Sequence, residues 1–259
     1  MDAGPHVGRG AGRGRLVLSP DPAHAGGAPP SALQPALPSA PADFIPAFLP
    51  LAPLAARPDI RLHMATAASR LSHLLGEGAA PPYWAFCWGG GLVLVEHLSR
   101  DPDCVRGRRV LDFGAGSGVV AIAAALAGAS HVRACEIDPV GRVAISLNSA
   151  ANGVAVDVIP PDRAADAVSD IDLVLAGDTF YDATVAAAAT AFFARCVERS
   201  VSVLVGDPGR AHLPHGRLSE IARYPVRDFA ASPGAAVGEG VVYAFGRLED
   251  GGNPHHVAV

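Results

Sequence analysis

Short apolar runs alternate with glycine or polar loops and with helical segments along most of the chain. The clearest repeat has an apolar run at Val110–Phe113, a glycine-rich loop, an alanine-rich segment at Val119–Leu126 and a second apolar run at Val132–Ile137. This order predicts a strand, a loop, a helix packed closely on a sheet and a second strand. Such a βαβ unit binds its ligand at the carboxyl ends of its strands.

The same pattern predicts further elements on both sides of this unit. Helices are expected at Ile60–Leu75, from Leu92 to Leu98, from Pro139 to Asn152 and at Val185–Val197. Further strands are expected at Ala155–Ile159, Ile171–Ala176, Val201–Val205, Arg223–Ala230 and Gly240–Leu248. Together these elements predict an α/β fold. It is a Rossmann-like, seven-stranded doubly wound sheet with an antiparallel last strand and helices on both faces.

The composition divides the chain into three parts. Residues 1–40 are crowded with Gly, Pro, Ala and Ser, and we expect a disordered tail there because little apolar surface can be buried. Three arginines in this tail suggest a transit peptide, but its prolines fit that poorly, and a start site assigned too far upstream explains the tail equally well. Residues 41–248 are expected to form the folded domain with a helical extension at its N-terminal side, and residues 249–259 a flexible tail.

Charge and cysteine content exclude several classes of protein. The 259 residues carry a formal net charge of −5, which argues against a general nucleic-acid surface. No apolar run reaches the roughly 18 residues of a membrane span. The four cysteines form no C-x-x-C pair, which favours free thiols in a reducing, cytoplasmic setting. No ligand pattern predicts a metal site, since the His255-His256 pair has no further ligands beside it. We expect a monomer.

Two acids flank the glycine-rich loop. Asp112 directly precedes Gly114, Gly116 and Gly118, and Glu136 follows the next strand. The third glycine comes one position too early for the dinucleotide fingerprint. The acid, the G-x-G-x-G loop and the second acid resemble the S-adenosyl-L-methionine site of class I methyltransferases. The resemblance implies that the loop admits the cofactor, that Asp112 faces its ammonium group and that Glu136 binds its ribose. The alternative is a glycine turn in an α/β domain without a nucleotide.

Two more residues are candidates for cofactor contact. Trp88 belongs to an aromatic block followed by glycines, and its indole either lines the cofactor cleft or covers the core as an aromatic lid. Asp162 lies in a polar loop at the carboxyl end of a predicted strand, where the adenine edge of the cofactor is expected.

Three blocks of sequence resemble one family. They are YWAFCWGG at Tyr83–Gly90, GDTFYD at Gly177–Asp182 and GDPGR at Gly206–Arg210. The chain is similar to the electron transfer flavoprotein β-subunit lysine methyltransferases from about Asp43 to Arg247. The resemblance implies a protein-lysine methyltransferase that uses S-adenosyl-L-methionine, with the flavoprotein β-subunit as its protein substrate.

The resemblance has limits. The family usually has Trp-Pro-Gly-Gly where this chain has Trp88-Gly89-Gly90, and many relatives carry Asp in place of Glu136. The cofactor half is also similar to the ribosomal protein L11 methyltransferases, although that family has an Asn-centred motif where this chain has Asp178. A ribosomal-protein or small-molecule N-methyltransferase therefore stays open as an alternative. So does a binding module without activity, although the intact loop and both acids argue against it.

Four residues at the ends of two predicted strands are candidates for substrate chemistry. Asp178 is expected beside the methyl group to orient the substrate amine and help remove its proton, or else to cap a helix. Asp182 is the better candidate for a cap of the next helix. Tyr181 either lines the lysine channel or belongs to the core. Asp207 and Arg210 either bind the protein substrate or lock their own turn by a salt bridge.

Overall fold

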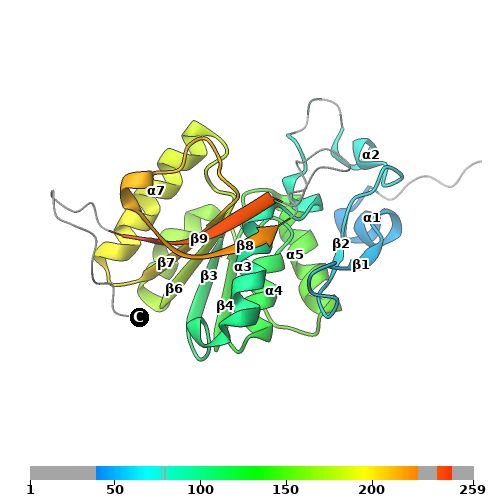
Figure 1. Cartoon of the computed structure of the whole chain (residues 1–259). Helices are drawn as coiled ribbons and strands as arrows, with labels where there is room; N and C mark the ends of the chain where they lie inside the picture. Colours follow the sequence, from blue (N-terminus) through cyan, green and yellow to red (C-terminus); the bar gives the residue numbers. More distant parts are fainter. Residues whose placement is uncertain (1–38, 77, 79, 227–237, 247–259) are drawn as a thin grey trace, which may run out of the picture. The chain divides into compact units, whose positions relative to one another are not determined.

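The computed structural model describes residues 39–76, 78, 80–226 and 238–246 (Figure 1). Its main sheet has the strand order β5-β4-β3-β6-β7-β9-β8. These strands are β3 (Arg109–Phe113), β4 (His131–Cys135), β5 (Asp157–Ile159), β6 (Leu173–Gly177), β7 (Ser202–Asp207), β8 (Leu218–Val226) and β9 (Gly238–Phe245). Neighbours from β5 to β7 are parallel, and β9 is antiparallel to both β7 and β8. The predicted seven-stranded, doubly wound sheet with an antiparallel last strand is confirmed.

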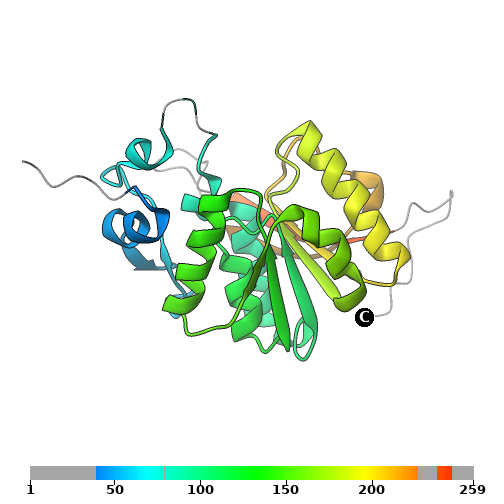
Figure 2. The ribbon, with the colours of Figure 1, turned by 180° about the vertical axis from the view of Figure 1, so that it is seen from behind.

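Helices cover both faces of this sheet (Figures 1 and 2). One face packs against α3 (Gly89–Arg100), α4 (Val119–Leu126) and α5 (Pro139–Ala151), and the other packs against α6 (Ala164–Ala167) and α7 (Ala183–Glu198). Successive residues of β3 show the division, because Val110 packs into the first cluster and Leu111 into the second. Central strands with two buried faces explain the continuous apolar runs in the sequence.

The N-terminal extension packs on α5 and corrects one prediction. It contains α1 (Pro41–Phe48), β1 (Leu51–Pro53), β2 (Arg61–His63) and α2 (Leu71–Leu75). The helix predicted over Ile60–Leu75 is therefore wrong for most of its length. The backbone N–H groups of Arg61 and His63 donate at 2.9 and 2.8 Å to Asn152, the C-cap of α5, and to Asn148 within α5, and β2 pairs with β1. These long-range contacts override the local helical spacing.

Other boundaries differ by a few residues. The helix α3 begins at Gly89, three residues before the predicted start, and β8 begins at Leu218, five residues before its predicted start. The remaining short helical turns are η1 (Tyr83–Ala85), η2 (Pro102–Cys104), η3 (Pro161–Arg163), η4 (Val168–Asp170) and η5 (His215–Arg217). Residues 1–38 of the predicted disordered tail, the predicted ends of the last two strands and the tail at 249–259 lie outside the described residues. Within the described part, no helix has the length and apolarity needed to cross a bilayer.

Candidate functional site

The glycine-rich loop joins β3 to α4 at the carboxyl edge of the sheet. Gly114, Gly116 and Gly118 have φ values of 72°, 54° and 80°, which residues with a Cβ rarely adopt. The N–H groups of Gly114 and Ala115 both donate to the Cys135 carbonyl at 3.0 Å, so the loop is held against the end of β4. A methyl group at Gly116 would meet no atom within 4 Å. The loop therefore leaves open space directly above its backbone.

Glu136 closes this loop from the neighbouring strand. Its Oε2 accepts a hydrogen bond from the Gly116 N–H at 2.8 Å, and its Oε1 accepts one from the Asp138 N–H at 2.8 Å. The side chain is buried, and burial raises the pKa of its carboxyl above the ordinary value. The structure thus brings the loop and the second acid together, as the sequence predicted. Contact of Glu136 with a ribose stays a prediction.

Asp112, the acid before the loop, lies in the interior. It is 1% exposed, and its Oδ2 accepts from the Ala121 N–H in the first turn of α4 at 2.9 Å. Burial raises the pKa of its carboxyl to about 7, and the nearby Glu136 adds to this effect. The side chain therefore holds α4 against the end of β3. Its predicted contact with a ligand ammonium stays a prediction.

An aromatic group borders the same edge of the sheet. The Trp88 indole N–H donates to the Tyr83 carbonyl at 2.9 Å, and the two rings meet edge to face at 5.6 Å. Tyr83 and Tyr181 are about half exposed, and their ring centroids lie 5.4 Å apart. Trp84, in contrast, is buried in the cluster under the N-terminal extension. Trp88 is therefore the tryptophan that lies at the surface of this edge.

Asp178 connects three segments that are distant in the sequence. Its Oδ2 accepts from the N–H groups of Gly90 and, at 3.3 Å, Gly91, which begin α3. Its Oδ1 accepts from Nε and Nη2 of Arg210 at 2.8 and 2.6 Å. The side chain is only 11% exposed, and its backbone has a φ of 54°. Asp178 therefore caps α3 and pairs with the loop after β7 at the same time.

Asp207 lies beside this pair and is completely buried. Its Oδ1 accepts from the N–H groups of Gly209 and Arg210 at 2.7 and 2.6 Å. Within the described residues its Oδ2 has no hydrogen-bond partner, and burial raises the pKa of the carboxyl to about 6. Asp207 thus holds its own turn through these two backbone hydrogen bonds, and the Arg210 guanidinium pairs with Asp178.

Two further residues singled out in the sequence lie in separate loops at the ends of strands. Asp182 caps α7 by accepting from the Thr184 and Val185 N–H groups, which confirms its predicted role. Asp162 lies exposed in η3 after β5.

Sequence reasoning missed two buried polar residues at the site. Thr179 is 4% exposed, its Oγ1 has no partner within the described part of the chain, and its Cγ2 would lie 3.5 Å from a methyl group at Gly114. Asn148 donates from Nδ2 to the Ser117 carbonyl at 2.9 Å and accepts at Oδ1 from the His63 N–H. Asn148 thus ties the glycine loop to the N-terminal extension. In the sequence, only the asparagines of this helical segment indicated a contact of this kind.

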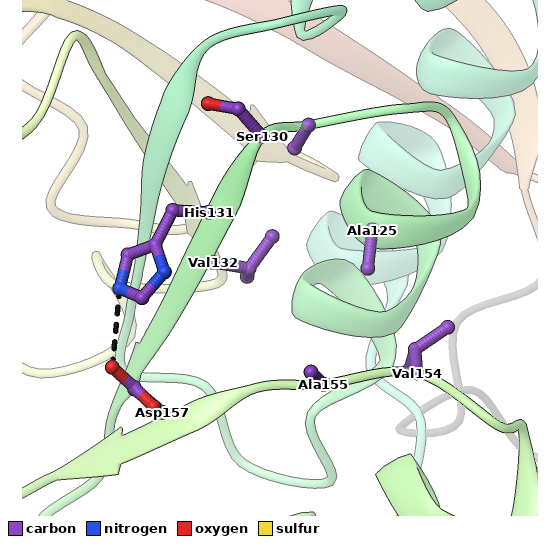
Figure 3. Close-up of a pocket in the computed structure, with 8 residues that line it drawn as sticks. Ala125, Ser130, His131, Val132, Val154, Ala155 and Asp157 are labelled. Carbon is purple, nitrogen blue, oxygen red and sulfur yellow. Dashed lines mark ion pairs between the residues drawn. The ribbon is translucent and has the colours of Figure 1, made fainter.

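A separate pocket of about 300 Å³ lies at the other end of β4 (Figure 3). It contains an ion pair between His131 Nε2 and Asp157 Oδ2 at 3.1 Å. Figure 3 shows that the Ser130 side chain points away from this pair. The three residues therefore do not form a nucleophilic triad.

The chain is similar in sequence to known methyltransferases. The family model for ribosomal protein L11 methyltransferase (PrmA) matches residues 93–177. The electron transfer flavoprotein beta subunit lysine methyltransferase of Rattus norvegicus is 38% identical over 149 residues, covering 55% of this chain and 58% of the relative. The protein of the same name in Xenopus laevis is 36% identical over 170 residues, covering 63% of this chain and 69% of the relative.

A solved structure of the 16S rRNA N2 G1207 methyltransferase RsmC of T. thermophilus, with AdoMet and guanosine, is 22% identical. It has a TM-score of 0.42 and covers 66% of this chain and 45% of that chain.

The sheet order, its antiparallel strand and the glycine loop between two acids define a class I methyltransferase fold. Within that class, the chain belongs to the electron transfer flavoprotein beta subunit lysine methyltransferase family. It spans 58%, 59% and 65% of the rat, zebrafish and human relatives that it matches.

Proposed function

We propose that this protein transfers methyl groups from S-adenosyl-L-methionine to lysine side chains of the electron transfer flavoprotein β-subunit. The observation that carries the proposal is the pairing of Glu136 with the glycine loop beside the Asp178–Arg210 pair, in a member of this family. The first feature suits a nucleoside ligand, and the second suits a cationic acceptor.

The residues at the loop fit the cofactor. Gly116 leaves room for a ligand against its backbone, and the buried Thr179 hydroxyl beside Gly114 offers an unpaired polar atom. Glu136 would bind the ribose hydroxyls, Gly114 would let the ligand approach the backbone, and Asp112 would lie behind the loop on the side of the methionine end of the ligand. Gly118, which the sequence also predicted to contact the cofactor, instead makes room for Ile145 of α5, because a methyl group there would lie 3.0 Å from Ile145 Cγ2. Trp88 and Asp162 would border its two ends. When bound, the cofactor supplies an activated methyl group on a sulfonium.

The acceptor side would position a lysine amine. A lysine must be neutral to act as a nucleophile, so a carboxylate that holds it and helps remove its proton favours the reaction. The guanidinium of Arg210 donates to Oδ1 of Asp178, at the position where a cationic amine could also donate. We infer that a substrate amine takes this position and that Arg210 then turns toward the incoming protein. Tyr181 is exposed beside this loop and would line the path of the lysine, and Asp207 would keep the Arg210 turn in place.

The free thiols and the net charge of the chain support proposals for its compartment and its partners. All four cysteines are free in the structure, which supports a reducing cytoplasm as the compartment. We propose a monomer that acts on a protein and does not bind nucleic acid, because the net charge is −5.

The L11 family model supports a second candidate, since residues 93–177 include the whole glycine loop and Glu136. On that candidate the substrate is a ribosomal protein. The match ends at Gly177, before Asp178 and the loop after β7. It therefore supports a similarity in the cofactor half of the molecule and not in the half proposed to bind the substrate.

One set of measurements tests the proposal. The purified chain is incubated with cofactor labelled in its methyl group and with either flavoprotein β-subunit or ribosomal protein L11, and the products are identified by mass spectrometry. We expect methyl-lysine on the flavoprotein. Methylation of L11 alone would move the assignment to the second candidate.

Calorimetry on the wild type and on Glu136→Ala tests the cofactor site separately. We expect the substitution to weaken cofactor binding by roughly 10- to 100-fold, because hydrogen bonds to a charged group contribute about 1.5–3 kcal/mol. Asp138→Asn is the control, since the Asp138 side chain caps α5, Asn caps as well, and the backbone N–H that donates to Glu136 is kept. Unchanged affinity in Glu136→Ala would remove the ribose assignment.

A further inference from the structure

Three side chains of the types that bind metals meet at the end of α3 that is far from Asp178. They are His97 in the last turn of α3, Asp101 at its C-cap and Cys104 in η2. The helix has 12 residues, so its two ends are about 18 Å apart. The group is therefore separate from the predicted methyl-transfer site.

The ligand atoms of these residues lie close together. One ring nitrogen of His97, one carboxylate oxygen of Asp101 and the Sγ of Cys104 are all within 4.8 Å of one another. Ligands of a tetrahedral zinc ion, with bonds of about 2.0–2.3 Å, lie roughly 3.3–3.8 Å apart. Small side-chain rotations would bring the three atoms onto one ion.

The backbone already fixes the spacing of the three residues. The Asp101 N–H donates to the His97 carbonyl at 2.8 Å, and the Cys104 N–H donates to the Asp101 carbonyl at 3.3 Å. Consecutive turns thus place His97, Asp101 and Cys104 on one side of the helix end. A local arrangement of this kind requires no movement of the sheet to receive an ion.

Tyr224 of β8 orients the imidazole. Its hydroxyl lies 3.0 Å from Nδ1 of His97, and His97 is 5% exposed. If Nδ1 keeps this bond, Nε2 is the nitrogen that remains for a metal. Metal-binding histidines almost always use their other nitrogen in such a hydrogen bond, which fixes the ring and its tautomer.

Charge and access also suit a divalent cation. A Cys104 thiolate and the Asp101 carboxylate would balance its two positive charges, and the C-terminus of a helix favours positive charge. Asp101 is exposed and Cys104 half-buried, so the site opens to solvent. The positive charge of Arg108 near Cys104 opposes the binding of a cation, and the negative charge of Asp103 offsets that of Arg108.

We propose that His97, Asp101 and Cys104 bind a divalent cation of the zinc class, with water in the fourth position. A thiolate and an imidazole select zinc or cobalt over magnesium and calcium, which prefer oxygen ligands only. The ion would join the end of α3 to η2 and, through His97 and Tyr224, to β8.

Cobalt(II) titration of the reduced, tag-free full chain tests this proposal. We expect one equivalent to bind with the near-ultraviolet band of a thiolate–cobalt bond and the strong visible bands of tetrahedral cobalt. Zinc should displace the cobalt, remove both signals and raise the thermal unfolding temperature. The chain has ten histidines in all, His97 included. Cobalt binding without a thiolate band would show that histidines elsewhere hold the ion and would overturn the proposal.

Matched variants locate the site. Cys104→Ser should abolish the thiolate band, whereas Cys196→Ala, a change at a buried cysteine packed against β7, should keep it. Asp101→Asn should weaken binding about 10-fold or more, whereas Asp103→Asn, which removes a nearby surface charge and no ligand, should weaken it by no more than about two- to threefold. Tyr224→Phe should weaken binding by roughly 10- to 100-fold. Equal behaviour of Asp101→Asn and Asp103→Asn would exclude Asp101 as a ligand, and a thiolate band that survives in Cys104→Ser would exclude the site.

Discussion

The two halves of the carboxyl edge are built in different ways. At the ends of β3 and β4, backbone N–H groups and glycines surround open space, and Glu136 closes the loop by accepting from Gly116. At the ends of β6 and β7, side-chain charges are paired with one another and with the start of α3 through Asp178 and Arg210. The first half is preformed for a ligand, whereas the second must exchange an internal contact to receive one. Substitutions should therefore separate the binding of the cofactor from the transfer of the methyl group.

The largest effect is expected from Asp178→Asn, which keeps the shape of the side chain and removes its charge. The methylation rate should fall by roughly 10²–10⁴, as for a lost acid–base group, while cofactor affinity stays within a few fold. Steady-state kinetics and calorimetry measure the two quantities. Asp182→Asn is the control, because Asp182 caps α7 four residues further on and Asn is an equally good cap.

Thermal unfolding of the same variant distinguishes chemistry from folding. Asp178→Asn should also destabilise the protein, because it removes the negative charge that accepts from the part-buried guanidinium of Arg210. Near wild-type turnover in a folded Asp178→Asn protein would show that Asp178 is structural.

The next effect tests how closely the second half is packed. A methyl group at Gly206 would lie 2.6 Å from Leu94 Cγ and would also clash with the Gly90 carbonyl. Gly206→Ala should lower the free energy of unfolding by about 3 kcal/mol, the upper range for an overpacked core. Urea denaturation measures it, and Gly238→Ala, where the nearest atom would be 3.7 Å away, should change it by less than about 0.5 kcal/mol. A stable Gly206→Ala protein would show that α3 can shift on the sheet.

The smallest effect concerns pH, because each half contains a buried carboxyl whose pKa is raised to about 6 or about 7. The pKa is about 7 for Asp112 and about 6 for Asp207, both above the value of an unfolded chain. Their contribution to stability is thus complete at low pH and is lost as the pH rises toward these values. Between pH 6 and 8 the loss should be on the order of 1 kcal/mol for Asp112 and clearly smaller for Asp207, whose pKa is lower.

Unfolding curves at several pH values measure this loss in Asp112→Asn, in Asp207→Asn and in the wild type. Asp112→Asn should flatten the decline more than Asp207→Asn does. An equal decline in all three proteins would show that neither carboxyl titrates in this range.

The sequence predicted the first half of the site better than the second. The loop and Glu136 belong to one local βαβ unit, in which order along the chain determines position in space. The partner of Asp178 was not predictable in this way, since Arg210 lies 32 residues further on and its nearest acid in the sequence was Asp207. The helix predicted over Ile60–Leu75 failed for the same reason, because Asn148 and Asn152 bind the backbone of β2 from far along the chain. Local patterns predicted elements, and side-chain contacts between distant segments had to come from the structure.

The glycines at Gly90, Gly177 and Gly206 have a consequence for exchanging parts between relatives. A methyl group at Gly177 would lie 2.7 Å from Gly91 N, and methyl groups at Gly90 and Gly206 would each meet the other's carbonyl oxygen. Backbone therefore rests on backbone where α3 crosses the ends of β6 and β7. The three sequence blocks that contain these glycines therefore pack against one another as a single unit. A chimaera that receives new loops after β6 and β7 must also receive the first turn of α3 from the same donor.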